Sequence, residues 1–415
     1  MTSAALPDTD TGTHIVPLRA DAPTIGLVSV AHGMSHFGQL LVPPLFPWIG
    51  AEFGLSNTQL GALLSVFFVV SFVGQALAGF VVDRYGAQRV LFMGVGCIAL
   101  GALGLSMSPN YATMLAFMAL AGLGNCVFHP VDFSILNSRI SAPRLGQAYA
   151  AHGISGSLGW ALAPVFVVGI VHAGGTWRTA LTCAGALVAL VWAVLWWQRR
   201  ALALPPLRAA RKAEVDADGS LAFLRLPAVW SCFAFFFVYA LALGGLQSFA
   251  PAAAGKLHEM TAAQLALCLS IYMVAAAAGA LWGGQLLRDP SRSAHVAATG
   301  FGVAAIVALM IALGDWSGST VLVLFAVMGL GSGIAGPSRD LLVKQATPPG
   351  ATGRVYGIVY SGLDVGMMTA PLLYGALMDA ANYRAVWIGV ALLLTLLIAS
   401  AFNVRSRWRA EPQLA

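Results

Sequence analysis

The sequence predicts an all-α membrane protein with twelve transmembrane helices arranged in two six-helix bundles. Three observations lead to this fold class: the composition, the length of the apolar stretches and a repeat that relates the two halves of the chain. The 415 residues are 59% hydrophobic and only 9% charged, whereas a soluble domain is about 25% charged. A soluble protein of this size could not cover its surface with so few charges, so the chain is expected to lie in lipid.

Twelve apolar stretches are long enough to cross a bilayer, which takes about 20 residues in a helix. Backbone groups in lipid find no water to bond, so each stretch is expected to be helical. The frequent glycine and alanine residues fit close contact between such helices. The expected spans are residues 24–50, 59–82, 90–108, 111–137, 147–172, 177–198, 226–254, 260–287, 294–313, 317–341, 354–379 and 383–404.

The second half of the chain repeats the first. Residues 122–124, Gly-Leu-Gly, recur at 329–331, and Pro130 recurs as Pro337 at the same spacing. Helical duplications of this kind bind solutes between their halves, near the middle of the bilayer, so the repeat predicts transport. The same spacing maps Gly146, Tyr149, Gly159 and Pro164 onto Gly353, Tyr356, Gly366 and Pro371.

The distribution of positive charge predicts the orientation. Of the 22 Lys and Arg residues, only Arg178, Lys256 and Arg384 fall between spans on the side opposite the termini. By the positive-inside rule both termini are therefore expected to be cytoplasmic, in a multi-pass protein of the cell (inner) membrane. The predicted segments are an N-terminal tail (1–23), an N-terminal bundle (24–198), a cytoplasmic linker (199–225), a C-terminal bundle (226–404) and a cytoplasmic C-terminal tail (405–415).

The composition also excludes several classes of protein. The net charge of +6 follows from basic loops on one side of the membrane, so no nucleic-acid partner is expected. No phosphate-binding loop, nucleophile elbow or zinc-protease motif occurs, so neither an enzyme nor a cofactor is predicted. The five cysteines fall inside apolar spans and indicate no disulfide framework. The expected partners are a small-molecule solute, protons and the lipid bilayer, and the oligomeric state is not predicted.

A specific motif joins the second and third spans. Residues 79–89 read Gly-Phe-Val-Val-Asp-Arg-Tyr-Gly-Ala-Gln-Arg. This run resembles the loop signature of the major facilitator superfamily, G-x-x-x-D-R-x-G-x-R/K-R/K, with Gln88 at one basic position. The resemblance covers nearly the whole chain and implies the major facilitator fold. It also implies a cytoplasmic gate motif made of Gly79, Asp83, Arg84, Gly86 and Arg89.

A narrower resemblance concerns the fourth and fifth spans. Ser35-His36, the Phe-His-Pro element at 128–130 and residues 156–164 resemble the fosmidomycin-resistance subfamily of efflux carriers. This resemblance implies export of a small organic solute driven by protons. Two departures favour an organic-acid importer or uniporter as the alternative: Ala163 stands where glycine is usual, and Met118 stands where many proton antiporters carry arginine.

Polar and ionisable side chains inside the spans define the predicted site, because their burial in lipid is costly and usually marks a lined cavity. His32 and His36 lie one turn apart, and the spacing of Asn125, His129 and Asp132 places them on one face of the fourth span. In the superfamily, spans one, four, seven and ten line the cavity. The candidates for substrate binding or proton coupling are His32, His36, Gln39, Asn125, His129, Asp132, His152, Gln247 and Asp364.

Several of these residues have a structural alternative. His36 and His129 could handle substrate or protons, because histidine titrates near neutral pH, or they could fix helix packing through a hydrogen bond. Asp132 could instead form a gate salt bridge with Arg139 or Arg339. His32 could be satisfied by Ser29 or by a backbone carbonyl.

The predicted mechanism is alternating access for a small organic solute, with proton antiport as the energy source. Asp364, the only carboxylate deep in the second half, could carry the proton, and His36 and His129 are the other leading candidates. Two further alternatives remain. His32, His36, His129 and Asp132 could ligate a divalent ion, which would make the protein a divalent-metal transporter. A non-transporting membrane sensor is the other, although neither terminus is long enough to fold alone as a signalling domain.

Overall fold

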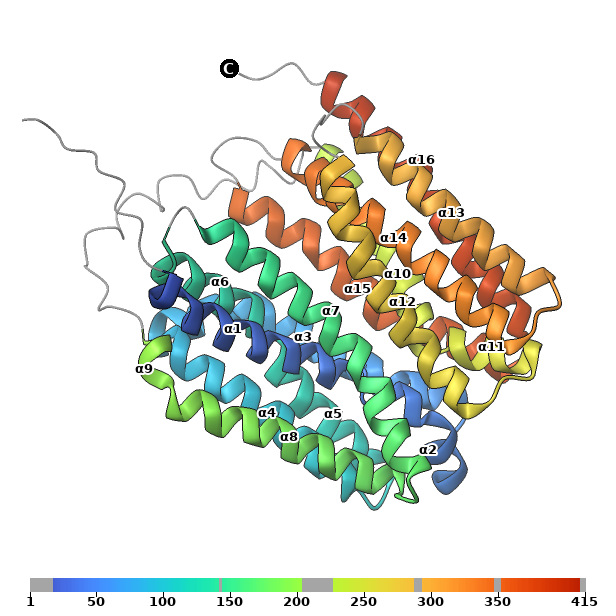
Figure 1. Ribbon diagram of the computed structural model, residues 1–415, viewed down its shortest axis with the longest axis horizontal. Helices are drawn as coiled ribbons and strands as arrows, with labels where there is room; N and C mark the ends of the chain where they lie inside the picture. Colours follow the sequence, from blue (N-terminus) through green and yellow to red (C-terminus); the bar gives the residue numbers. More distant parts are fainter. Residues whose placement is uncertain (1–17, 142–143, 204–226, 287–292, 347–351, 411–415) are drawn as a thin grey trace, which may run out of the picture.

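The computed structural model describes residues 18–141, 144–203, 227–286, 293–346 and 352–410 of the chain, and nearly all of them are helical (Figure 1). The first half contains α1 (Leu18–Gln39), η1 (Pro43–Leu45), α2 (Phe46–Phe53), α3 (Asn57–Tyr85), α4 (Ala87–Ser106), α5 (Tyr111–Asn125), α6 (Phe128–Arg139), α7 (Leu145–His172), α8 (Trp177–Trp197) and α9 (Arg199–Leu202). The second half contains α10 (Pro227–Ser248), α11 (Ala250–His258), α12 (Ala262–Leu286), α13 (Ser293–Leu313), α14 (Gly318–Ala346), α15 (Thr352–Asp379) and α16 (Tyr383–Ala410).

The expected spans coincide with these helices, which confirms the all-helical prediction. Eleven helices in the described part of the chain are long and apolar enough to cross a membrane. The expected span outside these eleven is the one at 354–379, which is α15 and lies beside α10 and α3 (Figure 1). Residues 1–17 and 204–226 lie outside the described residues, so the predicted boundaries of the tail and linker stay predictions.

Three of the spans are built from two shorter helices. In the first span, α1 ends at Gln39, and Pro43 and Pro44 begin the short η1 turn that leads into α2. Proline lacks an N–H group and is favoured in the first turn of a helix, which fits the start of η1 at these residues. The fourth span breaks between α5 and α6, and the seventh breaks at Phe249, between α10 and α11.

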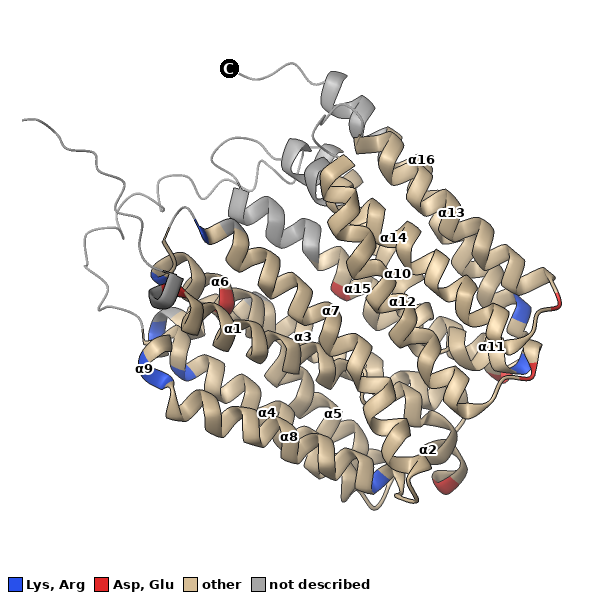
Figure 2. Ribbon diagram, viewed as in Figure 1, with Lys and Arg blue, Asp and Glu red and all other residues tan. Residues whose placement is uncertain are grey.

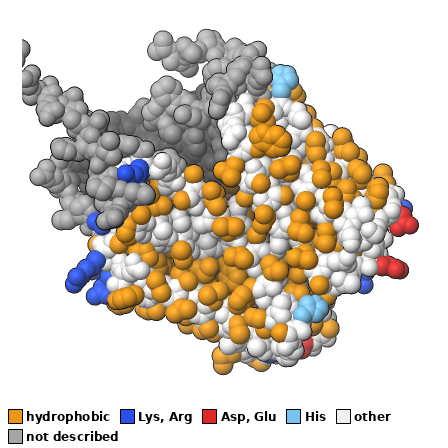
Figure 3. Space-filling view, viewed as in Figure 1, with side chains coloured by type: hydrophobic (Ala, Val, Ile, Leu, Met, Phe, Trp, Pro, Cys, Tyr) orange, Lys and Arg blue, Asp and Glu red, His pale blue; other side chains and the backbone are white. Residues whose placement is uncertain are grey.

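The surface has the distribution expected of a protein in lipid. Apolar side chains cover the broad face seen in Figure 3. Figure 2 shows Lys and Arg confined to the two ends of the described bundle, whereas acidic positions also occur inside it, on α6 and α15. These two interior positions belong to Asp132 and Asp364, which the sequence predicts as site residues.

The two halves meet along α3 and α15 and along α7 and α12. The Ser65 hydroxyl of α3 donates to the Met368 carbonyl of α15 at 2.6 Å, and the Ser270 hydroxyl of α12 donates to the Ala161 carbonyl of α7 at 2.6 Å. We call the end of the bundle opposite the termini, where α2 leads into α3, the distal end. These contacts join the halves on the distal side of the interface.

Asp379 closes the distal end of the α3–α15 contact. Its Oδ1 accepts from the backbone N–H of Asn57 at 2.6 Å and from the Asn57 side chain at 2.9 Å. Its Oδ2 accepts from the backbone N–H of Thr58 at 2.9 Å and from the Thr58 hydroxyl at 2.6 Å. A carboxylate at a helix N-terminus is favoured by the unpaired N–H groups and by the helix dipole. A residue of the second half therefore caps a helix of the first.

Replacing Asp379 with alanine is expected to loosen this end of the interface. Because the carboxylate is exposed, the contact is expected to lose only about 1 kcal/mol of stability. The equilibrium constant for local opening of this end of the interface would then rise about fivefold. Hydrogen exchange measured by mass spectrometry should show faster exchange at the start of α3. Asp315→Ala, which removes another exposed aspartate from the second half, should leave that exchange unchanged, and equal exchange in both variants would contradict the capping role.

Candidate functional site

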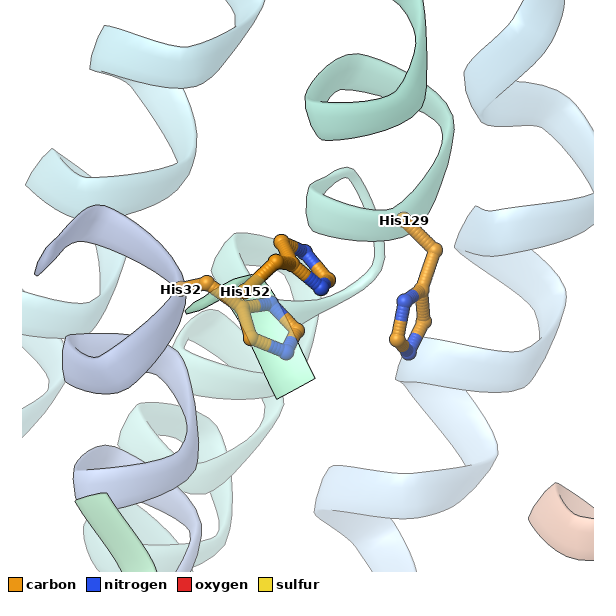
Figure 4. Close-up of side chains that lie close together, drawn as sticks. All are labelled: His32, His129 and His152. Carbon is orange, nitrogen blue, oxygen red and sulfur yellow. The ribbon is translucent and has the colours of Figure 1, made fainter. Parts of the chain in front are cut away.

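Three helices of the first half bring histidines together. His32 lies on α1, His129 on α6 and His152 on α7. The rings of His32 and His152 stack, with centroids 3.5 Å apart and 24° between their planes, and the His129 ring centroid lies 5.4 Å from that of His32. Figure 4 shows the rings of His32 and His152 together, with His129 facing them from α6. The sequence predicts each of these residues as a candidate, and the structure joins them into one cluster.

Asp132 of α6 connects two of the histidines. Its Oδ2 lies 3.0 Å from His152 Nε2 in a hydrogen bond and 3.2 Å from His32 Nδ1 in an electrostatic contact. The carboxylate is completely buried, and its Oδ1 has no hydrogen-bond partner among the described residues. Asp132 does not pair with Arg139, and the Arg339 side chain lies outside the described residues. The alternative salt bridge of Asp132 with Arg139 does not form in this arrangement, where the carboxylate contacts two histidines instead, and the alternative with Arg339 stays a prediction.

A second polar group lies next to the cluster. The His36 ring centroid is 4.1 Å from that of Trp160, and the indole N–H of Trp160 donates to Gln39 Oε1 at 2.9 Å. Gln39 Nε2 then donates to Asn125 Oδ1 at 2.9 Å, and Asn125 Nδ2 donates to Ser71 Oγ at 2.8 Å. This chain of hydrogen bonds connects α7, α1, α5 and α3, so Gln39 and Asn125 tie helices together in this arrangement.

Close contact between α1 and α7 makes the cluster possible. A Cβ atom on Gly159 would lie 2.1 Å from the carbonyl oxygen of Gly33, and a Cβ on Gly156 would lie 2.9 Å from the His36 ring. Glycine at these positions lets the two helices approach closely, as small residues do in membrane bundles. The same approach sets His32 of α1 against His152 of α7.

The fourth span does not form the single polar face that its spacing predicts. Helix α5 ends at Asn125 and α6 begins at Phe128, so Asn125 does not share a continuous helix with His129 and Asp132. Pro130 has no N–H to donate to the carbonyl four residues earlier, which weakens the helix here, but Pro337 at the equivalent position lies inside the continuous helix α14. Asn125 consequently joins the hydrogen-bond chain, and His129 and Asp132 join the histidine cluster.

The candidates in the second half lie apart from the cluster. Asp364 of α15 is half-buried, and its Oδ2 accepts from Gln75 Nε2 of α3 at 3.4 Å, across the interface between the halves. Gln247 is buried, and neither atom of its amide has a hydrogen-bond partner among the described residues. It lines a cleft of about 590 Å³ at the distal end, which is bounded by residues of both halves, including Pro44 and Lys256.

The predicted gate motif occupies the turn between α3 and α4. Gly86 has a φ of +84°, a backbone conformation that favours glycine, and it lets the chain turn directly from one helix into the next. Arg84 and Arg89 are exposed, and the side chain of Asp83 lies outside the described residues. Gln88, the departure from the family pattern, donates to the Arg199 carbonyl of α9.

Sequence reasoning missed two residues of functional interest. Trp160 was absent from the candidates although it contacts His36 and Gln39. The signal for it was its place within the 156–164 run. Asp379 was absent because a carboxylate at the end of a span resembles an ordinary loop residue, and only its partners in the other half reveal the cap.

The comparison with known proteins then decides the family. A sequence model described as Major Facilitator Superfamily matches residues 28–338 and 259–414, which together cover almost the whole chain. The chain belongs to the Major Facilitator Superfamily. This membership confirms the predicted fold class. It also confirms that the chain is a transporter and not an enzyme, because the relatives found in this family are transporters.

Relatives within the Major Facilitator Superfamily agree with this placement. YfnC of Bacillus subtilis, an uncharacterized transporter of this type, is 24% identical over 378 residues, covering 89% of this chain and 90% of the relative. The fosmidomycin resistance protein of Escherichia coli is 28% identical over 167 residues, which is 40% of this chain and 41% of that protein. A bacterial homologue of the human lysosomal transporter Spinster has the same fold, with a TM-score of 0.73 at 13% identity, over 95% of this chain and 97% of that structure. The protein is therefore a multi-pass secondary transporter.

Proposed function

We propose that this transporter exports a small organic solute across the inner membrane in exchange for protons, by alternating access between the two halves. Both termini would then be cytoplasmic, in agreement with the positive-inside distribution. The distal contacts of Asp379, Ser65 and Ser270 support an arrangement that is closed on the outer side. Solute would enter from the cytoplasm in this state and leave after the distal contacts separate.

The observation that carries the proton-coupling proposal is the contact of Asp364 with Gln75. A carboxylate of the second half accepts a hydrogen bond from an amide of the first, within the membrane-spanning part of the interface. Protonation of Asp364 would remove its charge and weaken it as an acceptor for Gln75. Proton binding would thus change how strongly one half holds the other, and a difference in affinity between two states is what shifts their populations.

The solute site is proposed to include the exposed edge of the histidine cluster. The His129 ring is exposed and lies 6.2 Å from the Phe133 ring, nearly parallel to it, with 17° between their planes. Together they offer an aromatic surface beside a hydrogen-bonding edge, the combination that ligand sites use to bind and orient small molecules. His36 is proposed to support this surface without contacting the solute, by packing against Trp160.

Asp364→Asn is expected to abolish transport driven by a pH gradient while preserving exchange of solute for solute. Asparagine keeps the size and polarity of the side chain but cannot bind and release a proton. Inverted membrane vesicles energised by a pH gradient provide the assay. Fosmidomycin is the first probe, because a relative is named for resistance to it, and carboxylates and cationic drugs follow.

The matched control is Gln75→Ala, which removes the partner of Asp364 but leaves its carboxyl group. This variant should keep pH-driven transport at a lower rate. Full pH-driven transport in Asp364→Asn would contradict the assignment of the proton to this residue. Accumulation of solute in the opposite direction, together with protons, would instead identify an importer.

A further inference from the structure

We propose that His32, His129 and His152 form a binding site for a divalent transition-metal ion such as Zn²⁺. Each histidine offers one ring nitrogen, and these ligand atoms lie within 4.8 Å of one another. The residues come from three different helices, α1, α6 and α7, and Figure 4 shows the His32 and His152 rings together with His129 on the facing helix. Imidazole nitrogen is a preferred ligand of zinc, and three protein ligands with one open position describe many accessible zinc sites.

Asp132 supplies the support that such a site requires. Its Oδ2 faces His152 Nε2 and His32 Nδ1, at 3.0 and 3.2 Å. A carboxylate accepts hydrogen bonds, so Asp132 favours a hydrogen on His152 Nε2, which bonds it. In a neutral imidazole the opposite nitrogen then carries the free electron pair. His152 Nδ1 is thereby prepared as a ligand, as in metal-bound histidines whose other ring nitrogen donates to a carboxylate. His32 Nδ1 lies 3.2 Å from the same oxygen without a hydrogen bond.

The charge and access of the cluster also fit a cation. The ion-pair contacts of Asp132 in the described part of the chain are with these histidines, and neither Lys nor Arg neutralises its negative charge there. His32 and His152 are buried, whereas His129 is exposed. A metal ion could therefore approach from the His129 side, and His129 would complete the site.

To close the site, the stacked rings of His32 and His152 must tilt apart, because a metal ion lies in the plane of each ring that binds it and these planes are only 24° from parallel. Zinc–nitrogen bonds of about 2.0–2.1 Å in a tetrahedral site place the nitrogens about 3.3 Å apart. The exposed His129 ring would then reach the ion by a change of side-chain torsion. The fourth position would stay open to water or to an oxygen atom of a solute. All three ligands belong to one bundle, so the site would persist while the halves move.

Calorimetric titration of the purified, tag-free protein with Zn²⁺ alone tests the site, and Co²⁺ absorption reports its geometry. We expect one ion per chain, with the intense visible bands of four-coordinate Co²⁺. His129→Ala is the primary variant, because its exposed side chain makes misfolding least probable, and it should bind at least about tenfold more weakly. Asp132→Asn should weaken binding by about 10–100-fold.

His172→Ala, which removes an exposed histidine at the end of α7, is the matched control and should bind like the unaltered protein. Absence of Zn²⁺ binding would overturn the proposal, and so would equal binding by the His129→Ala variant. Octahedral Co²⁺ bands would overturn the three-histidine geometry. The titration needs no transported solute, so its outcome is independent of the export assay.

Discussion

Replacing Gly61 with alanine is expected to lower the transport rate by about tenfold while leaving each bundle folded. A Cβ atom at Gly61 would lie 2.3 Å from the carbonyl oxygen of Pro371 and 2.8 Å from its carbonyl carbon. Both are backbone atoms, so α3 and α15 would have to separate to admit the methyl group. Overpacking of this kind costs about 1–3 kcal/mol, enough to depopulate the distally closed state by about tenfold. Transport in inverted vesicles should fall accordingly.

The matched control is Gly169→Ala, because a Cβ at Gly169 of α7 would meet no atom within 4 Å. This variant should transport normally. Hydrogen exchange at the start of α3, where Asp379 caps Asn57 and Thr58, should rise in Gly61→Ala and stay unchanged in the control. Normal transport by Gly61→Ala would show that the two halves need not meet at this point during the cycle.

The fold was predictable because its signals lie within short stretches of sequence. Apolar length predicts where a helix crosses the membrane, and it depends on about 20 consecutive residues. The helix breaks were harder to predict. The length of an apolar stretch does not indicate where a helix breaks within it. Only Pro43, Pro44 and Pro130 indicated where η1 and α6 begin. The repeat predicted two bundles, since the same glycines and prolines recur in each half.

The site was predictable in its members but not in its contacts. An ionisable residue inside a span is costly, so His32, Asp132 and His152 stood out in the sequence. Their contact depends on how α1 and α7 pack, and that packing is decided by Gly156 and Gly159 meeting the other helix. A single sequence carries no information on which helices are neighbours. The pairing of Asp132 with two histidines, in place of an arginine, therefore had to come from the structure.

Asp132→Ala is expected to destabilise the first bundle. The substitution removes a buried carboxylate from His152 Nε2 and His32 Nδ1 and leaves polar nitrogens buried without it. Leaving a buried hydrogen-bond donor without its partner costs about 1–3 kcal/mol. The thermal unfolding midpoint of the purified protein should therefore fall by several degrees. Asp132→Asn keeps an acceptor oxygen in place and should lose less.

The comparison between these two variants separates packing from charge. Alanine removes the side chain that joins α6 to α1 and α7, whereas asparagine removes only the charge. If both variants unfold at the same lowered temperature, the charge holds the cluster together. If asparagine restores most of the stability, the hydrogen bond to His152 is the main contribution. An unchanged unfolding midpoint in Asp132→Ala would mean that helix packing alone holds the rings of His32 and His152 together, with their centroids 3.5 Å apart.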